Sequence, residues 1–184
     1  MLLTTTTAIT SAQVGQWWSL YESAFDELRT AAVQRHVMLR AEFHAVMADE
    51  RVTKYVAVDE SAGGRCCALA TATTDLAAMP LISPDYFAHR WPQLYAERRI
   101  WYVGFVAIAA EHHRGPLFGR IVGDVARSAA AVGGVTAMDV SRQVTEQRRL
   151  PQVLARYFAR LAPGTRALQL DEQAFWAYEF PAPD

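Results

Sequence analysis

The segment 101–132 constrains the fold of this chain more than any other part of it. Residues 101–109 form an uninterrupted apolar run (WYVGFVAIA), which predicts a buried central strand. A polar loop at 110–115 follows, and Pro116 suits the first position of a helix. We expect that helix at 116–132, because apolar residues recur there at spacings of three and four: Leu117, Phe118, Ile121, Val122, Val125, Ala129 and Val132. The three elements together predict a mixed α/β fold.

The rest of the chain also alternates between predicted helices and strands. We expect strands at 4–9, 52–58, 66–73, 135–140, 167–170 and 175–180, and helices at 11–32, 39–48 and 151–161. The turn at 61–64 makes 52–58 and 66–73 an antiparallel hairpin. Residues 75–100 break the pattern, since Pro80, Pro84 and Pro92 exclude long regular structure. An irregular insertion or binding loop is therefore expected at 75–100.

Composition narrows the class of protein. The 184 residues fit one domain, 1–184, and 52% hydrophobic residues exclude a disordered chain. A formal net charge of −1 does not favour binding to nucleic acid or to an anionic membrane surface. No run approaches the roughly 20 apolar residues of a membrane span. The first residues lack the basic and apolar regions of a signal peptide, so a cytoplasmic location is expected.

Cys66 and Cys67 are adjacent, and no histidine or cysteine stands at metal-ligand spacing from them. We therefore expect two buried, reduced thiols on a strand and no metal site.

The start of the helix at 116 is a candidate anion site. Free backbone N–H groups and the positive end of the helix dipole favour a phosphate there, and Arg114 stands beside them. The glycine and lysine pattern of a P-loop is absent, and so is the three-glycine fingerprint of dinucleotide-binding folds.

The order of elements over nearly the whole chain resembles that of the GCN5-related N-acetyltransferase (GNAT) family. The signature of that family is Gln or Arg, two residues, Gly, one residue, and Gly or Ala, at the start of the helix after the fourth strand. Residues 114–119 (RGPLFG) match it at Arg114 and Gly119. Leu117 stands where the family has its middle glycine, and Pro116 removes one N–H donor.

The resemblance implies a single-domain GNAT-like fold, with a central mixed, mostly antiparallel sheet flanked by helices. It implies direct transfer of an acyl group from acetyl-CoA, or another acyl-CoA, to a small-molecule or peptide amine in a ternary complex. Backbone groups of Val106, Ala107 and Ile108 would bond the pantetheine arm like an added strand. The pyrophosphate would lie on the turn formed by Arg114, Gly115, Pro116, Leu117, Phe118, Gly119 and Arg120.

Several side chains are candidates for the chemistry. Glu111 and His113, with His112 between them, are candidate bases near the end of the central strand, although solvated loop residues are the simpler interpretation. The family often uses a late-helix tyrosine as the acid that protonates the departing thiolate. Tyr157 is one residue away from that position, and a core role for it is equally consistent. Asp139 is a candidate for orienting the amine.

The aromatic residues of 75–100 have two interpretations. Tyr86, Trp91 and Tyr95 would line an acceptor pocket on the acceptor side of the fold, or form the surface of a homodimer. Two alternatives to the acetyltransferase also stay open. One is a non-catalytic CoA-binding or regulatory module, suggested by Pro116 and Leu117. The other is a long-chain N-acyl synthase, suggested by the very apolar central strand.

Overall fold

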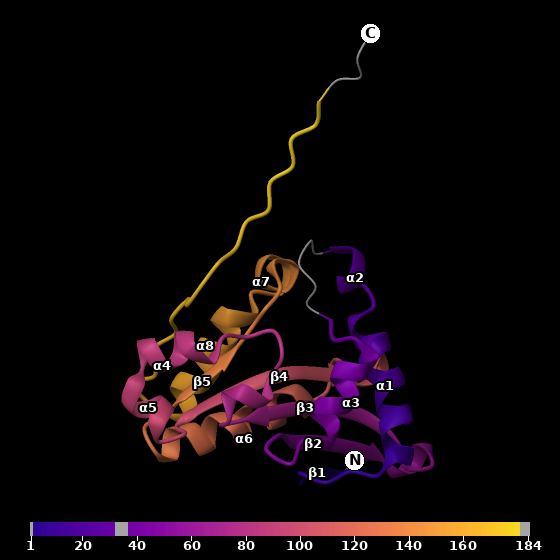
Figure 1. Cartoon of the computed structure of the whole chain (residues 1–184). Helices are drawn as coiled ribbons and strands as arrows, with labels where there is room; N and C mark the ends of the chain where they lie inside the picture. Colours follow the sequence, from indigo (N-terminus) through magenta and orange to yellow (C-terminus); the bar gives the residue numbers. More distant parts are fainter. Residues whose placement is uncertain (1, 32–36, 181–184) are drawn as a thin grey trace.

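The structure is a computed structural model that describes residues 2–31 and 37–180 (Figure 1). Its sheet has the strand order β1-β2-β3-β4-β5, and its strands are Leu2–Thr6, Thr53–Asp59, Arg65–Thr73, Ile100–Ile108 and Val135–Met138. The pairs β1–β2, β2–β3 and β3–β4 are antiparallel, and β4 and β5 run parallel. The predicted mixed, mostly antiparallel sheet is confirmed.

The helices are α1 to α8, with bounds Ser11–Phe25, Leu28–Ala31, Arg40–Ala48, Pro84–Arg90, Pro92–Ala96, Leu117–Ala131, Arg142–Arg148 and Leu150–Leu161. One face of the sheet is covered by α1, α3 and α4 through an aromatic cluster. Within it, the ring of Tyr21 on α1 lies 4.8 Å from that of Phe105 on β4, and Trp18 lies 5.3 Å from Phe43 on α3. No helix in the described parts of the chain is long and apolar enough to cross a membrane.

The opposite face of the sheet packs against α6. Leu117, Ile121 and Val125 of α6 share a buried cluster with short side chains of the strands, among them Ala57, Ala68, Ala70 and Ala72. The two cysteines show the strand alternation directly. Cys66 belongs to the aromatic side and Cys67 to the α6 side, and both are buried, reduced thiols, as predicted. Burial raises the pKa of the Cys66 thiol to about 12, so it is a poor nucleophile.

Residues 75–100 are not the irregular insertion that their prolines predicted. Each of α4 and α5 begins at a proline, Pro84 and Pro92, where the missing N–H and the fixed φ angle cost a helix nothing. Ser83 caps α4 by accepting a hydrogen bond from the Tyr86 N–H at 3.4 Å. The prolines therefore mark helix starts as well as interruptions.

Three other predictions of elements need correction. The expected helix at 11–32 is divided into α1 and α2, and its last residue, Ala32, lies outside the described residues. The helix α7, which follows β5 and is capped by Ser141, was not predicted. The closing strands expected at 167–170 and 175–180 are absent, because nothing in the structure pairs with those residues as a strand.

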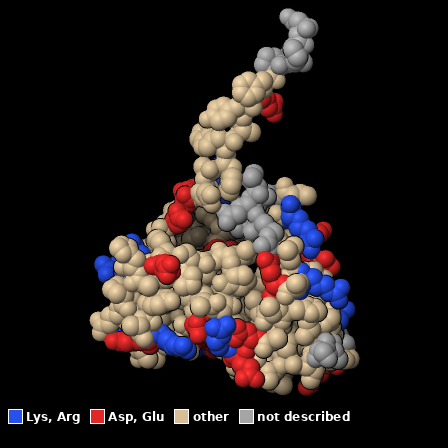
Figure 2. Space-filling model, in the orientation of Figure 1, with Lys and Arg blue, Asp and Glu red and all other residues tan. Residues whose placement is uncertain are grey.

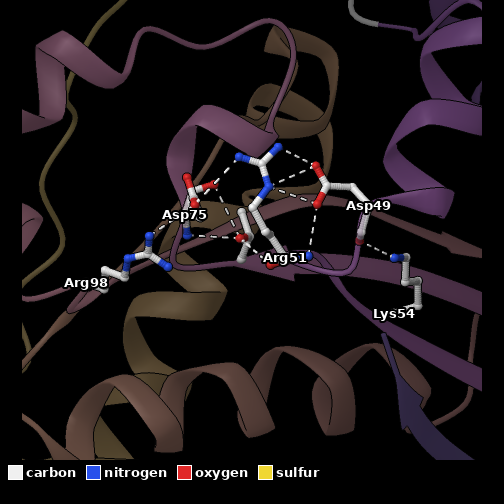
Figure 3. A network of polar contacts seen from close by, with 6 residues as sticks. Asp49, Arg51, Lys54, Asp75 and Arg98 are labelled. Carbon is white, nitrogen blue, oxygen red and sulfur yellow. Dashed lines mark hydrogen bonds and ion pairs between the residues drawn. The ribbon is translucent and has the colours of Figure 1, made fainter. Parts of the chain in front are cut away.

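An ion-pair network fixes the loop that leads from β3 into α4 (Figure 3). The Arg51 guanidinium makes three hydrogen bonds to the Asp49 carboxylate, at 2.9, 3.1 and 2.5 Å, and lies 3.7 Å from Asp75, which also pairs with Arg98 at 3.3 Å. Beside them, the buried Lys54 ammonium donates to the Asp49 carbonyl at 2.6 Å. The network joins the turn before β2 to the segment after β3. On the face that Figure 2 shows, charges of both signs are interspersed.

Candidate functional site

The pairing between strands β4 and β5 ends halfway along β4. Ile100–Val103 of β4 pair with Val135–Met138 of β5, and β4 then continues to Ile108 without that partner. Within the described residues, no strand pairs with the β5 side of β4 from Gly104 onward. The peptide groups that point away from β3 in this half are therefore open for a ligand that binds like an added strand. We call this half of β4 the open edge.

A β-bulge at Gly104 marks the point of separation. Thr71 of β3 faces Phe105, and Ala72 faces Val103, so Gly104 has no partner in β3. A Cβ atom on Gly104 would lie 2.7 Å from the Thr71 hydroxyl oxygen and 2.8 Å from the Met79 sulfur. Only glycine fits there without movement, and a bulge increases the local twist that carries β4 away from β5.

The first turn of α6 has free backbone donors. Pro116 is the N-cap residue, no side chain caps the helix, and the first helical residues are Leu117, Phe118 and Gly119. The N–H groups on either side are occupied, because Gly115 donates to His112 O and Arg120 donates to Pro116 O, each at 2.9 Å. Helix geometry leaves the N–H groups of 117–119 without an intrahelical acceptor. They form a site for an anion at the positive end of the helix dipole.

Leu117 does not obstruct this site. Its side chain is 1% exposed and belongs to the buried cluster beneath α6, together with Ile121 and Val125. The leucine side chain that stands in place of the family's glycine therefore points into the core, and the Leu117 N–H stays at the start of the helix. Pro116 costs the site little, because its position is the cap and precedes the three free donors.

A cavity of about 360 Å³ lies between α6 and α8 next to this turn, lined by Phe118, Gly119, Val122, Val153, Leu154, Arg156, Tyr157 and Arg160. Arg156 and Arg160 are exposed, and so are Arg114 and Arg120 near the start of α6. None of these four guanidinium groups has an ion pair or hydrogen-bond acceptor among the described residues. In a chain of net charge −1, they are a local excess of positive charge at the cavity and the helix start.

Tyr157 joins α8 to the first turn of α6. Its hydroxyl donates a 2.9 Å hydrogen bond to the Gly119 carbonyl, and its ring lines the cavity. Gly123 makes this contact possible, because a Cβ atom there would collide with the Tyr157 hydroxyl. The structure therefore brings Tyr157 to the predicted anion turn, with its hydroxyl engaged in a structural bond.

The other loop candidates are engaged in building the loop after β4. Glu111 forms an exposed ion pair with Arg65 at 2.8 Å, on the β3 side of β4. The His113 Nε2 lies 2.8 Å from the Ile108 carbonyl and, as the protonated nitrogen, donates to it. His112 Nε2 lies 3.6 Å from Asp59. These three side chains are not brought to the point where β4 and β5 separate.

Asp139 is the predicted residue that stands at that point. It directly follows β5, and it accepts a 3.0 Å hydrogen bond from the hydroxyl of Tyr102 on β4. Burial raises the pKa of the Tyr102 hydroxyl far above its usual range, and the negative charge of Asp139 is the second cause. Tyr102 therefore remains a hydrogen-bond donor. Asp139 itself is exposed, which leaves its second oxygen available to a cation. Tyr102 was missed within the apolar run, although a buried tyrosine hydroxyl usually has a partner.

Of the three aromatic residues predicted for an acceptor pocket, Tyr86 and Trp91 pack against Phe87, whose ring lies 6.1 Å from that of Tyr102. Trp91 and Tyr95 are half-buried and pack against the aromatic side of the core. The Tyr86 hydroxyl donates to the Leu170 carbonyl at 3.0 Å and holds the segment after α8 to α4. Each of the three thus has packing contacts, and the acceptor-pocket and homodimer roles stay predictions.

Comparison with known proteins supports the fold. No family model and no curated protein matches this sequence. The BH1408 protein of Bacillus halodurans shares 14% identity over 96% of this chain and 100% of its own, with a TM-score of 0.54. The aminoglycoside 6′-N-acetyltransferase AAC(6′)-Ih of Acinetobacter baumannii shares 11% identity over 98% of this chain and 100% of its own, with a TM-score of 0.52.

A third structure, AAC(6′)-Iy in complex with a bisubstrate analogue of CoA and an acetylneamine, has 12% identity over 97% of this chain and 99% of its own, with a TM-score of 0.51. At such identities the likeness shows the fold alone. The chain has the GNAT fold, as the order of its elements predicted.

Proposed function

We propose that this chain is an N-acyltransferase that moves an acyl group from acyl-CoA, ordinarily acetyl-CoA, to an amine. The observation that carries the proposal is the start of α6: three free N–H groups beside the open edge, with Leu117 turned into the core. A strand edge followed by an anion site matches the chemistry of CoA, which joins an amide-containing arm to a pyrophosphate. The GNAT fold supports the same reading.

In this proposal, the pantetheine arm lies along Val106, Ala107 and Ile108 of the open edge. The Ala109 N–H donates to Cys67 O of β3, and successive residues of a strand point their peptide groups to opposite edges, so the groups of Ala107 also face β3. Because His113 holds the Ile108 carbonyl, the pantetheine amides bond the backbone groups of Val106 and the Ile108 N–H. The pyrophosphate accepts from the N–H groups of 117–119, with Arg114 and Arg120 beside it. Arg156 and Arg160, on the cavity between α6 and α8, supply positive charge for the third phosphate of CoA.

The chemistry needs a neutral amine, a polarised thioester and a proton for the departing thiolate. The Asp139 carboxylate binds the incoming ammonium and accepts a proton from it, while Tyr102 holds the carboxylate in place. The amine nitrogen then forms a bond to the thioester carbon as the C–S bond breaks, with backbone N–H groups near the Gly104 bulge polarising the carbonyl. Tyr157 gives its proton to the thiolate after releasing Gly119 O, and the Tyr157 oxygen then takes up the second proton from the acylated nitrogen. Asp139 returns its proton to solvent.

Placement favours Asp139 over Glu111 and His113 as the acid-base group. Glu111 is neutralised by Arg65 on the surface, and His113 is bound to the end of β4. The acceptor is accordingly proposed to be a small-molecule or peptide amine that enters as a cation. An aminoglycoside, the acceptor class named for AAC(6′)-Ih, is one member of that class.

Calorimetric titration with CoA, acetyl-CoA and a long-chain acyl-CoA tests the proposal, followed by an acetyl-transfer assay on a panel of amines. Arg114→Ala should weaken CoA binding by about 1.5–3 kcal/mol if its guanidinium contacts a phosphate. Arg142→Ala is the matched control, because Arg142 is exposed and its ion pair, with Glu146 at 2.7 Å, lies within α7.

The outcomes separate the alternatives. Binding of CoA with transfer to an amine supports the enzyme. Binding without transfer to any amine would indicate a non-catalytic CoA-binding module, and a strong preference for the long chain would indicate an N-acyl synthase. Absence of binding to all three ligands would refute the proposal.

A further inference from the structure

Thr71 of β3 carries a buried hydroxyl without a hydrogen-bond partner. The side chain is 0% exposed, and its Oγ1 atom finds neither a donor nor an acceptor in the part of the chain that the structure describes. Buried side-chain polar atoms are paired in the large majority of cases, because an unpaired one has lost its water without compensation. This hydroxyl is therefore a donor available to a ligand.

Thr73, two residues further along the same strand, shows the ordinary state of such a hydroxyl. It is also buried, and its hydroxyl donates to the Arg51 carbonyl at 2.7 Å and accepts from the Asp75 N–H at 3.0 Å. Alternate residues of a strand point to the same face, so both threonines share the aromatic side of the sheet with Leu69. Thr71 and Thr73 thus form a matched pair of buried hydroxyls, one with partners and one without.

The unpaired hydroxyl lies against the bulge at which the open edge begins. A Cβ atom on Gly104 would lie 2.7 Å from Thr71 Oγ1, so the hydroxyl occupies space that a side chain at 104 would need. The Met79 sulfur, 2.8 Å from the same position, is the other close atom. Gly104 is the first residue of β4 beyond its pairing with β5. Only the backbone of one glycine therefore separates the Thr71 hydroxyl from the open edge.

The carboxylate proposed to bind the amine belongs to the same bulge. Tyr102, which donates to Asp139, lies on the aromatic side of the sheet, as does the ring of Phe105. Gly104 stands between Tyr102 and Phe105, and a side chain there would point to the same side, toward Thr71. A reacting group at Gly104 therefore has a hydroxyl from β3 on one side of β4 and a carboxylate from the end of β5 on the other.

The reacting group that the proposed function brings to this bulge is a thioester carbonyl. The pyrophosphate lies at the start of α6, beyond Ile108, so the pantetheine arm runs back along β4 toward Gly104. Two carbon atoms separate the last amide of the arm from the sulfur, and each residue of a strand spans about 3.3 Å. With that amide bonded to Val106, the acyl carbon comes to the level of Gly104. Its carbonyl oxygen is the kind of acceptor that the Thr71 hydroxyl lacks.

We propose that the Thr71 hydroxyl donates a hydrogen bond across Gly104 to the carbonyl oxygen of the acyl thioester. This inference rests on the proposed function and adds to it the side chain that holds the reacting carbonyl. As the C–N bond forms, one electron pair of the C=O bond moves to the oxygen, and it returns as the C–S bond breaks with its pair going to sulfur. Thr71 keeps its proton throughout and stabilises the charge on the oxygen, from a buried position where a hydrogen bond is stronger than in water.

Calorimetry with acetyl-CoA and with CoA tests this hydrogen bond without turnover. CoA lacks the acyl carbonyl, so Thr71→Val, which keeps the shape of the side chain, should weaken acetyl-CoA binding about 3–10-fold and leave CoA binding unchanged. Thr71→Ser keeps the hydroxyl and should retain the wild-type preference. Thr73→Val is the control, and its ratio of acetyl-CoA to CoA affinity should equal that of wild type.

The outcomes separate this inference from the function on which it rests. If Thr71→Val binds acetyl-CoA as tightly as wild type while both bind CoA, the hydroxyl does not hold the carbonyl, and the inference is wrong although the CoA site stands. If wild type binds neither ligand, the proposed function fails and the inference fails with it. With an amine that accepts the acyl group, Thr71→Val should lower kcat about 100-fold with little change in the KM of the amine, and an unchanged kcat would overturn the inference.

Equilibrium unfolding in urea shows whether any loss has a structural origin. Thr71→Val removes a buried group that has no partner among the described residues, so its midpoint should stay at or above that of wild type. Thr73→Val leaves the Arg51 carbonyl and the Asp75 N–H without their partner, so its midpoint should fall. If Thr71→Val lowered the midpoint as much as Thr73→Val, the Thr71 hydroxyl would have a partner within the fold, and the proposal would be wrong.

Discussion

Replacement of Leu117 by alanine tests whether this residue belongs to the core or to the anion site. Its side chain is 1% exposed, so the full cost of a core truncation applies. Leu→Ala changes in cores cost about 2–5 kcal/mol, depending on how far the neighbours fill the space. Leu117 shares its cluster with Ala68, Ala70 and Ala72, whose short side chains have nothing to move into a cavity. We therefore expect the upper part of that range, about 3–5 kcal/mol.

Equilibrium unfolding in urea measures this loss. The midpoint should fall with little change in slope, and Leu117→Met, which keeps the volume, should cost less than about 1.5 kcal/mol. A loss below about 1 kcal/mol for the alanine variant would refute the burial argument. CoA affinity gives a second readout. If Leu117→Gly bound CoA more tightly than wild type, the side chain would be obstructing the phosphate, contrary to its inward placement.

Three further predictions concern the bulge, the α6–α8 contact and the network of Figure 3. Gly104→Ala should lower the free energy of unfolding in urea by about 1–3 kcal/mol, because the new Cβ would lie 2.7 Å from the Thr71 hydroxyl oxygen. Gly119→Ala is the control, because open space surrounds Gly119, and its free energy of unfolding should stay within about 0.5 kcal/mol of wild type. Tyr157→Phe should lose about 1 kcal/mol of stability with its bond to Gly119 O, and an acid role predicts a further fall in kcat without a change in KM; an unchanged kcat would leave only the structural role. Hydrogen bonds from Arg51 hold the pKa of Asp49 below its usual range, so this pair stabilises the fold above about pH 4 and the stabilisation is lost as pH falls through the lowered pKa. Arg51→Met should therefore flatten the loss of stability as the pH falls below about 5, by a small amount because solvent screens so exposed a pair, and an unaltered pH profile would contradict the assignment.

The sequence predicted best those elements whose pattern depends on local contacts. The apolar run of β4 and the stripe of α6 were placed within a residue or two, because each records burial directly. The error at 75–100 came from reading Pro84 and Pro92 as interruptions when both are first residues of short helices. Propensity alone does not distinguish those two uses of proline.

The candidate site depends on distances that the sequence does not express. Arg114, Gly119 and the free turn between them were found because the motif is local. The contact of Tyr102 with Asp139 joins residues far apart in sequence, and it exists because β5 ends where β4 bulges at Gly104. The missing closing strand is a different case. The alternation at 175–180 is that of a strand, but a strand needs a partner, and alternation does not say whether the partner is the same chain.

The account depends most directly on CoA binding along the open edge and at the start of α6. Titration of isotope-labelled protein with CoA, followed by backbone amide resonances, locates the ligand residue by residue. The account predicts that the largest shifts fall on the amides of 105–108 and 117–119, with those of α3 and β1 unchanged. Binding that shifts neither segment, or shifts confined to α3 and β1, would contradict it.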